Sequence, residues 1–153
     1  MAQVTLLCGP AGAGKTTLAR GLEAAGAVVL SFDREAWARG VRDGRPSRAL
    51  VEAIDADLHA RLRQAVAAGE RVVVDASMAA RWVRDAWRSR CEALGASHEL
   101  VVVSAPLAVL RERVRARAPG PESVVLGDAA LAAYVDGFEW PGADEPHTLR
   151  TTA

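Results

Sequence analysis

The feature that most constrains this chain is a glycine-rich segment close to its first residue. Residues 9–16 read GPAGAGKT and match the pattern G-x-x-x-x-G-K-[ST]. In this pattern, successive backbone N–H groups point at phosphate oxygens, and the N-terminus of the next helix adds its positive end. The match is specific only between a strand and a helix. Here the apolar run VTLLC precedes it and the helix-forming run TTLARGLEAA follows, so the segment is predicted to be a phosphate-binding loop.

Two side chains of this loop carry specific chemistry. Lys15 is expected to reach the β- and γ-phosphates of ATP, and the hydroxyl of Thr16 is expected to bind Mg²⁺. Lys15 is the only lysine in a chain whose 18 other basic residues are arginine. A compact ammonium suits a position beside transferring oxygens better than a planar guanidinium does. The expected nucleotide-binding residues are Gly9, Ala11, Gly12, Ala13, Gly14, Lys15, Thr16 and Thr17.

The rest of the sequence alternates short apolar runs with helix-length stretches. The apolar runs are rich in β-branched residues and lack polar alternation, which is typical of strands buried on both faces of a parallel sheet. They span Gln3–Cys8, Ala27–Ser31, Arg71–Asp75 and Glu99–Ser104. The helical stretches end at glycine or begin with proline. They span Lys15–Ala25, Arg48–Ala68, Ala80–Leu94 and Pro106–Arg117.

This order predicts a single α/β domain over residues 1–153. The expected architecture is a three-layer P-loop NTPase fold with a mostly parallel, doubly wound sheet of about five strands. A short helix at Asp128–Asp136 and a last, edge strand at His147–Thr152 complete the expected elements.

Length and charge exclude several classes of protein. A net charge of zero and a pI near 6.8 argue against binding nucleic acid through bulk electrostatics. No apolar run is long enough for a membrane-spanning helix, and the first residues lack the basic start of a secretory signal, so a cytoplasmic protein is expected. The segment Glu122–Glu145 holds six acidic residues and no basic ones. It is predicted to be a solvated face, or one that meets basic clusters of a second subunit, and the oligomeric state stays open.

Two aspartates follow predicted strands, where the carboxyl ends of a parallel sheet line a ligand crevice. Asp33 follows the second strand and could accept a proton from an attacking hydroxyl, although it could equally cap the next helix. Asp75 ends the third strand and is expected to hold Mg²⁺ together with Thr16, with a helix cap as the alternative.

Arginines cluster at three places near these carboxylates. Arg113 and Arg117 close the fourth predicted helix, just before the stretch APGPES, and an arginine-rich lid over about residues 111–126 is expected to bring them to the γ-phosphate. Each arginine could also be solvated surface or a complement to the helix dipole. The candidate acceptor-binding residues are Arg34, Trp37 and Arg84, although a tryptophan at such a position more often serves helix packing.

With these motifs in place, the chain resembles the compact P-loop kinases that include polynucleotide 5′-kinases, zeta toxins and chloramphenicol phosphotransferases. The resemblance rests on the segments GPAGAGKTT, VVLSFD, VVVDAS and VVVSAP and on RERVRARAPGPES, and it covers nearly the whole chain. It implies transfer of the γ-phosphate of ATP to a hydroxyl. Asp33 then matches the general base of the family, and Arg117, with Arg113 beside it, falls where lid arginines clamp the transferring group.

The sequence departs from this family at three points. Polynucleotide kinases carry an arginine three residues beyond the base, where this chain has Ala36, so a nucleic-acid 5′ end is less favoured as acceptor than a small molecule. Ser77 stands nearest to the usual asparagine after the third strand. The chain ends after its presumed last strand, without the closing helix of many relatives, as a near-minimal or shortened member would.

Two other functions fit the same motifs. One is a nucleotide-dependent binding or regulatory ATPase module without a phosphorylated acceptor. The other is a metabolite kinase of the shikimate or gluconate type.

Overall fold

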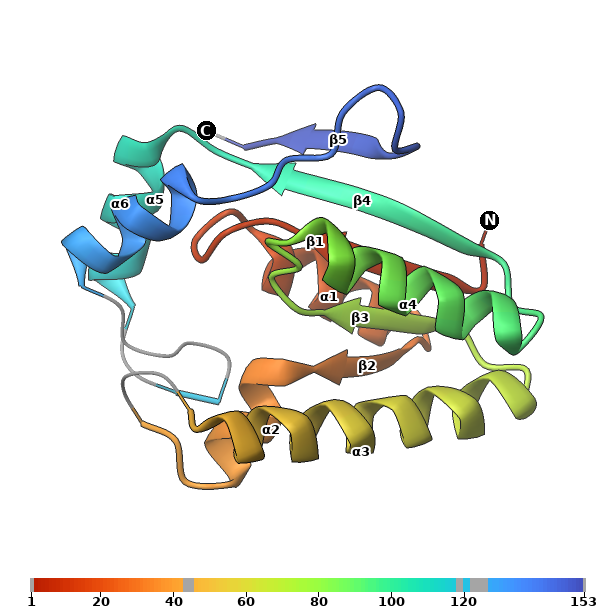
Figure 1. The fold of residues 1–153 in the computed structure, drawn as a ribbon. Coiled ribbons are helices and arrows are strands. Elements are labelled where there is room, and N and C mark those ends of the chain that lie inside the picture. Colours follow the sequence, from red (N-terminus) through yellow and green to blue (C-terminus); the bar gives the residue numbers. More distant parts are fainter. Residues whose placement is uncertain (1, 43–45, 118–119, 122–126, 153) are drawn as a thin grey trace.

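The structure is a computed structural model that describes residues 2–42, 46–117, 120–121 and 127–152. Strands and helices alternate along most of the chain (Figure 1). The strands are β1 (Val4–Cys8), β2 (Val28–Ser31), β3 (Val72–Asp75), β4 (His98–Ser104) and β5 (Thr148–Thr151). The helices are α1 (Lys15–Ala24), α2 (Phe32–Ala38), α3 (Arg48–Ala67), α4 (Arg81–Ala93), α5 (Leu107–Ala116) and α6 (Asp128–Asp136).

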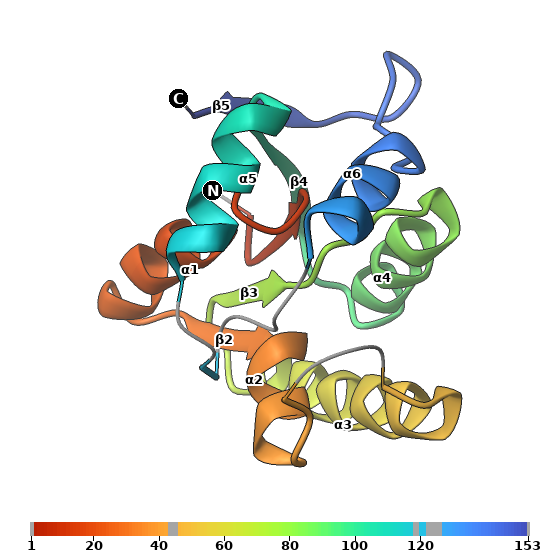
Figure 2. The same ribbon diagram turned by 90° about the vertical axis from the view of Figure 1, so that its left-hand side faces the viewer.

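These strands form one sheet in the order β2-β3-β1-β4-β5, and every pairing in it is parallel. The central strand β1 leads into the phosphate-binding loop, and β3 lies beside it with Leu7 opposite Asp75. Figure 2 views the edge toward which the strands point, where the loop after β1, helix α2 and helices α5 and α6 gather. The functional segments predicted from sequence therefore converge on one edge of the sheet.

The sheet is covered on both faces, so strands β1 to β4 read as continuous apolar runs, whereas the edge strand β5 is exposed. Helices α1 and α5 cover one face, where Ala19 and Leu110 pack against residues such as Val73. Helices α3 and α4 cover the other face (Figures 1 and 2). The buried stripe of α3 recurs at helical spacing and consists of Ile54, Leu58, Leu62 and Ala65. Burying one such leucine side chain stabilises the fold by about 1.5–3 kcal/mol.

The predicted fold class is confirmed. The five strands lie within one residue of the predicted runs at each end, and the sheet is entirely rather than mostly parallel. The short helix at Asp128–Asp136 and the edge strand are both present. No helix among the residues that the structure describes is long and apolar enough to cross a membrane.

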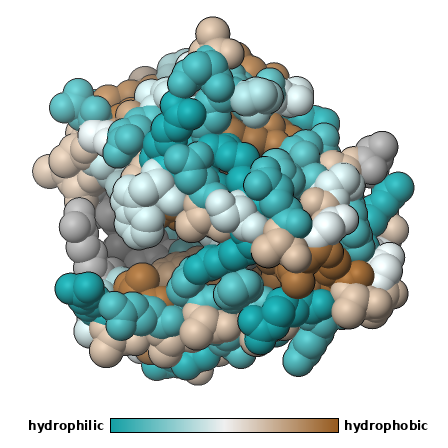
Figure 3. Space-filling model, turned by 45° about the vertical axis from the view of Figure 1, so that its right-hand side comes forward, coloured by the Kyte–Doolittle hydropathy of each residue, from teal (hydrophilic) through white to brown (hydrophobic). Residues whose placement is uncertain are grey.

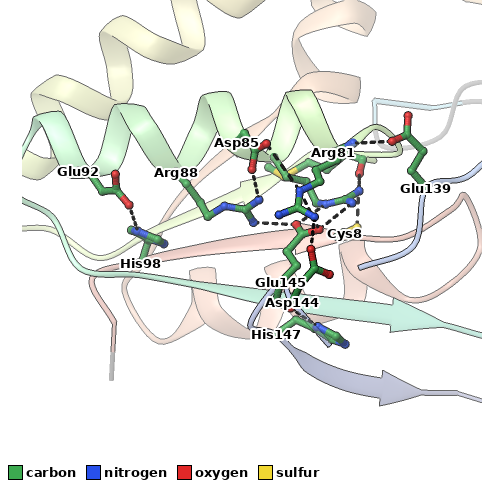
Figure 4. Close-up of polar contacts among 12 residues, drawn as sticks. Cys8, Arg81, Asp85, Arg88, Glu92, His98, Glu139, Asp144, Glu145 and His147 are labelled. Carbon is green, nitrogen blue, oxygen red and sulfur yellow. Dashed lines mark hydrogen bonds and ion pairs between the residues drawn. The ribbon is translucent and has the colours of Figure 1, made fainter. Parts of the chain in front are cut away.

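The acidic segment Glu122–Glu145 is solvated over most of the part that the structure describes, as predicted, and Glu145 is the exception. After α6 the chain passes over the start of α4 on its way to β5, so its acidic side chains meet arginines of the same chain (Figure 4). Glu145 is buried against Arg84, and Asp144 pairs with Arg81 at 2.6 Å. These ion pairs lie within one chain, and contact of the segment with a second subunit stays a prediction.

The outer surface of helices α3 and α4 is mostly polar. Over α3 and α4, Figure 3 shows a largely hydrophilic surface broken by small apolar patches. This surface is typical of amphipathic helices whose apolar faces are turned to the sheet.

Candidate active site

The phosphate-binding loop is held tightly against the carboxyl edge of the sheet. A Cβ at Gly9 would lie 2.2 Å from the carbonyl oxygen of Val103 in β4, so no other residue fits this close approach. Gly14 caps α1 with φ at +110°, a left-handed conformation that favours glycine. The Gly9 N–H also donates to the Ser77 carbonyl at 3.1 Å, which ties the loop to the connection after β3. The loop therefore leads directly into a helix whose first N–H groups have no partners within the helix.

The two predicted metal ligands lie side by side. The Thr16 hydroxyl donates to Oδ2 of Asp75 over 3.3 Å. Asp75 does not cap α4, because the residue at that position is Ala80 and no side chain makes a capping bond. Hydroxyl and carboxylate oxygens are the donors that Mg²⁺ prefers, and Mg²⁺ commonly takes its other ligands from substrate phosphates and water. The residues that the structure describes contain no group of three or more His, Cys, Asp or Glu side chains suited to a metal, so this pair fits a nucleotide-bound Mg²⁺ rather than an all-protein site.

A cavity of about 230 Å³ lies at the end of the loop. It brings together the loop lysine and both aspartates that the sequence pointed to. The described residues that line it are Lys15, Phe32, Asp33, Asp75, Ala76 and Ser77. One cavity thus holds a cation for phosphate, a carboxylate for a metal and a second carboxylate for a proton.

Asp33 lies in the first turn of α2, and the cap of this helix is Ser31, whose hydroxyl accepts from the Arg34 N–H at 3.2 Å. The alternative role of Asp33 as the cap is therefore excluded. The residue keeps an exposed surface, but its carboxyl group lies among protein atoms closely enough that loss of hydration raises its pKa. The negative charge of Asp75 raises this pKa further, while Lys15 and Arg117 oppose the shift.

Lys15 shows the converse shift. Burial lowers the pKa of its ammonium, the two aspartates of the cavity oppose this change, and Arg117 adds to it. Its Nζ donates to the Pro10 carbonyl over a long 3.4 Å. The loop lysine is therefore a half-buried cation near two carboxylates, where an anionic phosphate would complete its charge balance.

The two predicted lid arginines have different surroundings. Arg117 follows the end of α5 and lies near enough to Lys15 and Asp33 to lower the pKa of both. Arg113 instead donates from Nη1 to the Gly12 carbonyl at 3.0 Å and to the Thr152 hydroxyl at 2.7 Å. Arg113 thus contacts the backbone of the phosphate-binding loop and does not line the cavity. Residues 118–119 and 122–126 of the predicted lid lie outside the described residues.

None of the three predicted acceptor-binding residues lines the cavity. Arg34 pairs with Glu23 at 2.8 Å. Trp37 lies under the guanidinium of Arg42, whose central carbon is 3.7 Å from the ring centroid. Arg84 is 1% exposed and is bound by Glu145. The structure therefore gives Arg34 and Arg84 ion pairs within the chain, and it gives Trp37 a packing contact.

Sequence reasoning missed two contributors to the site. Phe32 lines the cavity, and its position directly before Asp33 at the end of a strand is a signal that could have found it. Tyr134 of α6 lies near Ser77, which lowers the pKa of its hydroxyl while burial raises that pKa overall. Nothing in the sequence around Tyr134 indicates that a helix 100 residues after Asp33 returns to this cavity.

Fold and site together define a P-loop nucleotide-binding domain of the kinase-like type. The AAA domain family AAA_33 matches residues 4–141, and the chain belongs to this family. No match was found among curated protein sequences.

Similar solved structures have the same fold. A candidate kinase from Chloroflexus aurantiacus superposes with a TM-score of 0.76 at 18% identity, covering 97% of this chain and 86% of that one. A gluconokinase from Sinorhizobium meliloti gives 0.66 at 19%, covering 98% and 82%. Kti12 from Chaetomium thermophilum, in complex with ADP-AlF3, gives 0.68 at 18%, covering 98% and 88%. Identities this low show a shared fold, and these neighbours include kinases and a nucleotide complex.

Proposed function

We propose that this protein is an ATP- and Mg²⁺-dependent kinase that phosphorylates a hydroxyl of a small molecule. The observation that carries the proposal is the single cavity that joins Lys15, Asp33 and Asp75 at the end of a phosphate-binding loop. A regulatory ATPase would need the lysine and the metal-binding carboxylate, but it would not need a second carboxylate with a raised pKa facing them. Asp33 therefore favours transfer to an acceptor.

In this proposal each group has one task. The loop N–H groups and Lys15 bind the phosphates of ATP, and Thr16 and Asp75 would hold Mg²⁺. When bound, the metal would neutralise charge on the transferring phosphate. Asp33 accepts the proton of the acceptor hydroxyl while the oxygen of that hydroxyl bonds to the γ-phosphorus. The bond between the γ-phosphorus and the β-phosphate oxygen breaks, which leaves ADP. Arg117 adds positive charge near the transferring group.

The lining of the cavity supports a small acceptor that carries no phosphate of its own. Among the lining residues that the structure describes, Lys15 is the sole cation, and it is already assigned to ATP. Phe32 offers an apolar surface and Ser77 a hydroxyl, a combination that suits one face of a hydroxylated ring or chain. Ala36 is buried, so it supplies no grip for an acceptor phosphate. These features favour a sugar-like or other hydroxylated metabolite over a nucleic-acid 5′ end.

The experiment that tests this proposal is a transfer screen with ATP labelled at the γ-phosphate. The acceptors are sugars, sugar acids, aminosugars, nucleosides, and RNA and DNA with 5′-hydroxyl ends. We expect label to pass to a small hydroxylated molecule. Label that passes only to nucleic-acid ends would overturn the acceptor class, and label released only as inorganic phosphate, across the whole screen, would favour the regulatory ATPase.

A further inference from the structure

The phosphate-binding loop is held by two side chains from far along the sequence. Arg113 of α5 donates to the Gly12 carbonyl at 3.0 Å, and the Thr152 hydroxyl donates to the next carbonyl, that of Ala13, at 2.9 Å. These two side chains also bond to each other at 2.7 Å. The Thr152 N–H in turn donates to the Ser104 carbonyl at 2.8 Å, which fixes Thr152 beside the end of β4.

This arrangement controls the direction of the loop N–H groups. A peptide unit is planar and trans, so a carbonyl held on one side directs the N–H of the next residue to the opposite side. The Ala13 carbonyl is held by Thr152, and the Gly14 N–H is therefore directed away from Thr152. The Gly12 carbonyl is held by Arg113, and the Ala13 N–H on the same peptide unit closes a turn onto the Pro10 carbonyl at 3.2 Å. Both peptide units of the glycine-rich turn are thus set by these bonds.

Such a constraint matters because glycine loses more conformational freedom on ordering than any other residue. Gly12 and Gly14 both have positive φ angles, at +84° and +110°. If the loop is already ordered before ATP binds, less of the free energy of ATP binding is lost to ordering the loop.

We propose that Arg113 and Thr152 form a latch that holds the phosphate-binding loop in its binding conformation. Both are positioning residues, and the residue that follows edge strand β5 thereby becomes part of the nucleotide site. The inference rests on the proposed function only in that the loop binds a nucleotide. It replaces the expectation that Arg113 clamps the transferring phosphate.

The test is the affinity for ADP with Mg²⁺, measured by isothermal titration calorimetry on the whole chain. Thr152→Val keeps the shape of the side chain and removes its hydroxyl, and we expect it to weaken ADP binding about tenfold, as the loss of one hydrogen bond would. Thr152→Ser keeps the hydroxyl and should bind within about twofold of wild type. Arg115→Ala is the matched control, because Arg115 lies on the same helix but pairs with Asp128 at the surface; its ADP affinity should not change.

Two further measurements separate a latch from general destabilisation. Thermal unfolding without nucleotide should be nearly the same for Thr152→Val and Thr152→Ser, while their ADP affinities differ. The double variant of Arg113→Ala and Thr152→Val should weaken ADP binding less than the sum of the two single effects, since both side chains act on one turn. If Thr152→Val does not fold, Arg113→Gln compared with Arg115→Gln makes the same test.

Several results would overturn the latch. One is wild-type ADP affinity in Thr152→Val, or in Arg113→Gln where Thr152→Val does not fold. Another is an equal loss of ADP affinity in Thr152→Val and Thr152→Ser. Strictly additive effects in the double variant would also contradict it. The kinase proposal fails separately: a wild-type protein that binds ADP but phosphorylates nothing leaves the latch standing, whereas a wild-type protein that does not bind ADP removes both.

Discussion

Two regions of the chain bring acidic and basic side chains together, and the pKa of a carboxyl group is lowered in one and raised in the other. Arg84 of α4 donates two hydrogen bonds of 2.7 and 3.0 Å to the carboxylate of Glu145. Arg88 of the same helix pairs with this carboxylate at 2.9 Å (Figure 4). Burial alone would raise the pKa of Glu145, but these guanidinium groups outweigh it and lower the pKa. In the cavity, loss of hydration raises the pKa of Asp33 more than the positive charge of Lys15 lowers it, so this pKa is raised overall.

The difference shows what each region does. A buried carboxylate that is matched by two guanidinium groups fixes the structure, and it has little capacity left for a ligand. The carboxylates and the lysine of the cavity balance one another only in part, so a phosphate, a metal ion and a proton can each still be bound there. Arginines supply the positive charges of the first region, whereas the only lysine of the chain lies in the second.

Lys15→Arg changes the cavity alone, and it should have the largest effect of the variants that compare the two regions. The substitution keeps the charge but replaces a compact ammonium with a wide planar group inside a cavity of about 230 Å³. We expect the rate of phosphoryl transfer to fall by about 10²–10³-fold, the range for loss of one well-placed charge stabiliser. Steady-state kinetics with the acceptor from the transfer screen gives the measurement. Transfer at the wild-type rate would mean that the lone lysine is an accident of composition.

Glu145→Gln tests the other region. It leaves Arg84 buried and unpaired, so the free energy of unfolding should fall by about 3 kcal/mol, as measured by urea denaturation. Asp128→Asn is the control, because it breaks an ion pair at the surface and should change stability little. If the two variants lose the same stability, the buried network does not hold the fold. The ADP affinity of the folded Glu145→Gln protein should stay near that of wild type.

The smallest expected effect is a separation of two pH dependences. A general base must be deprotonated, so activity falls as pH decreases through the pKa of Asp33, about tenfold per pH unit below it. Since this pKa is raised, the fall begins at a higher pH than for an ordinary aspartate. Glu145 has a lowered pKa, so its stabilisation is fully present above the pKa of an unfolded glutamate and is lost only as pH falls toward the folded value.

Activity should therefore be lost at a pH where the fold is still intact. The measurement is kcat/KM against pH beside urea denaturation at the same pH values. Loss of activity and of stability at the same pH would show that the acid limb reports unfolding rather than Asp33.

The fold and the centre of the site could be predicted from the sequence because both depend on local patterns. Buried parallel strands read as apolar runs, and the loop pattern places Lys15 and Thr16 without reference to anything distant. Asp33 and Asp75 follow because parallel strands end at one edge. The sequence left capping as the alternative for both, and the structure excludes it through Ser31 and Ala80.

The remaining features depend on which distant segments meet, and no local pattern specifies that. Arg84 and Arg113 belong to helices whose arginines look alike in sequence, yet one meets Glu145 and the other meets Gly12 and Thr152. These three partners lie at least 39 positions away along the chain from the arginines that they bind. An abundance of arginine made each of these side chains a candidate for the phosphate, and only the path of the chain after α6 separates their tasks.

The central claim is that Asp33 serves as the base of a phosphoryl transfer, and one paired measurement on Asp33→Asn tests it most directly. Transfer of labelled γ-phosphate to the acceptor and affinity for ADP with Mg²⁺ are determined on the same preparation. We expect transfer to be abolished while ADP affinity stays within about twofold of wild type. Transfer that continues at a rate near that of wild type would contradict it.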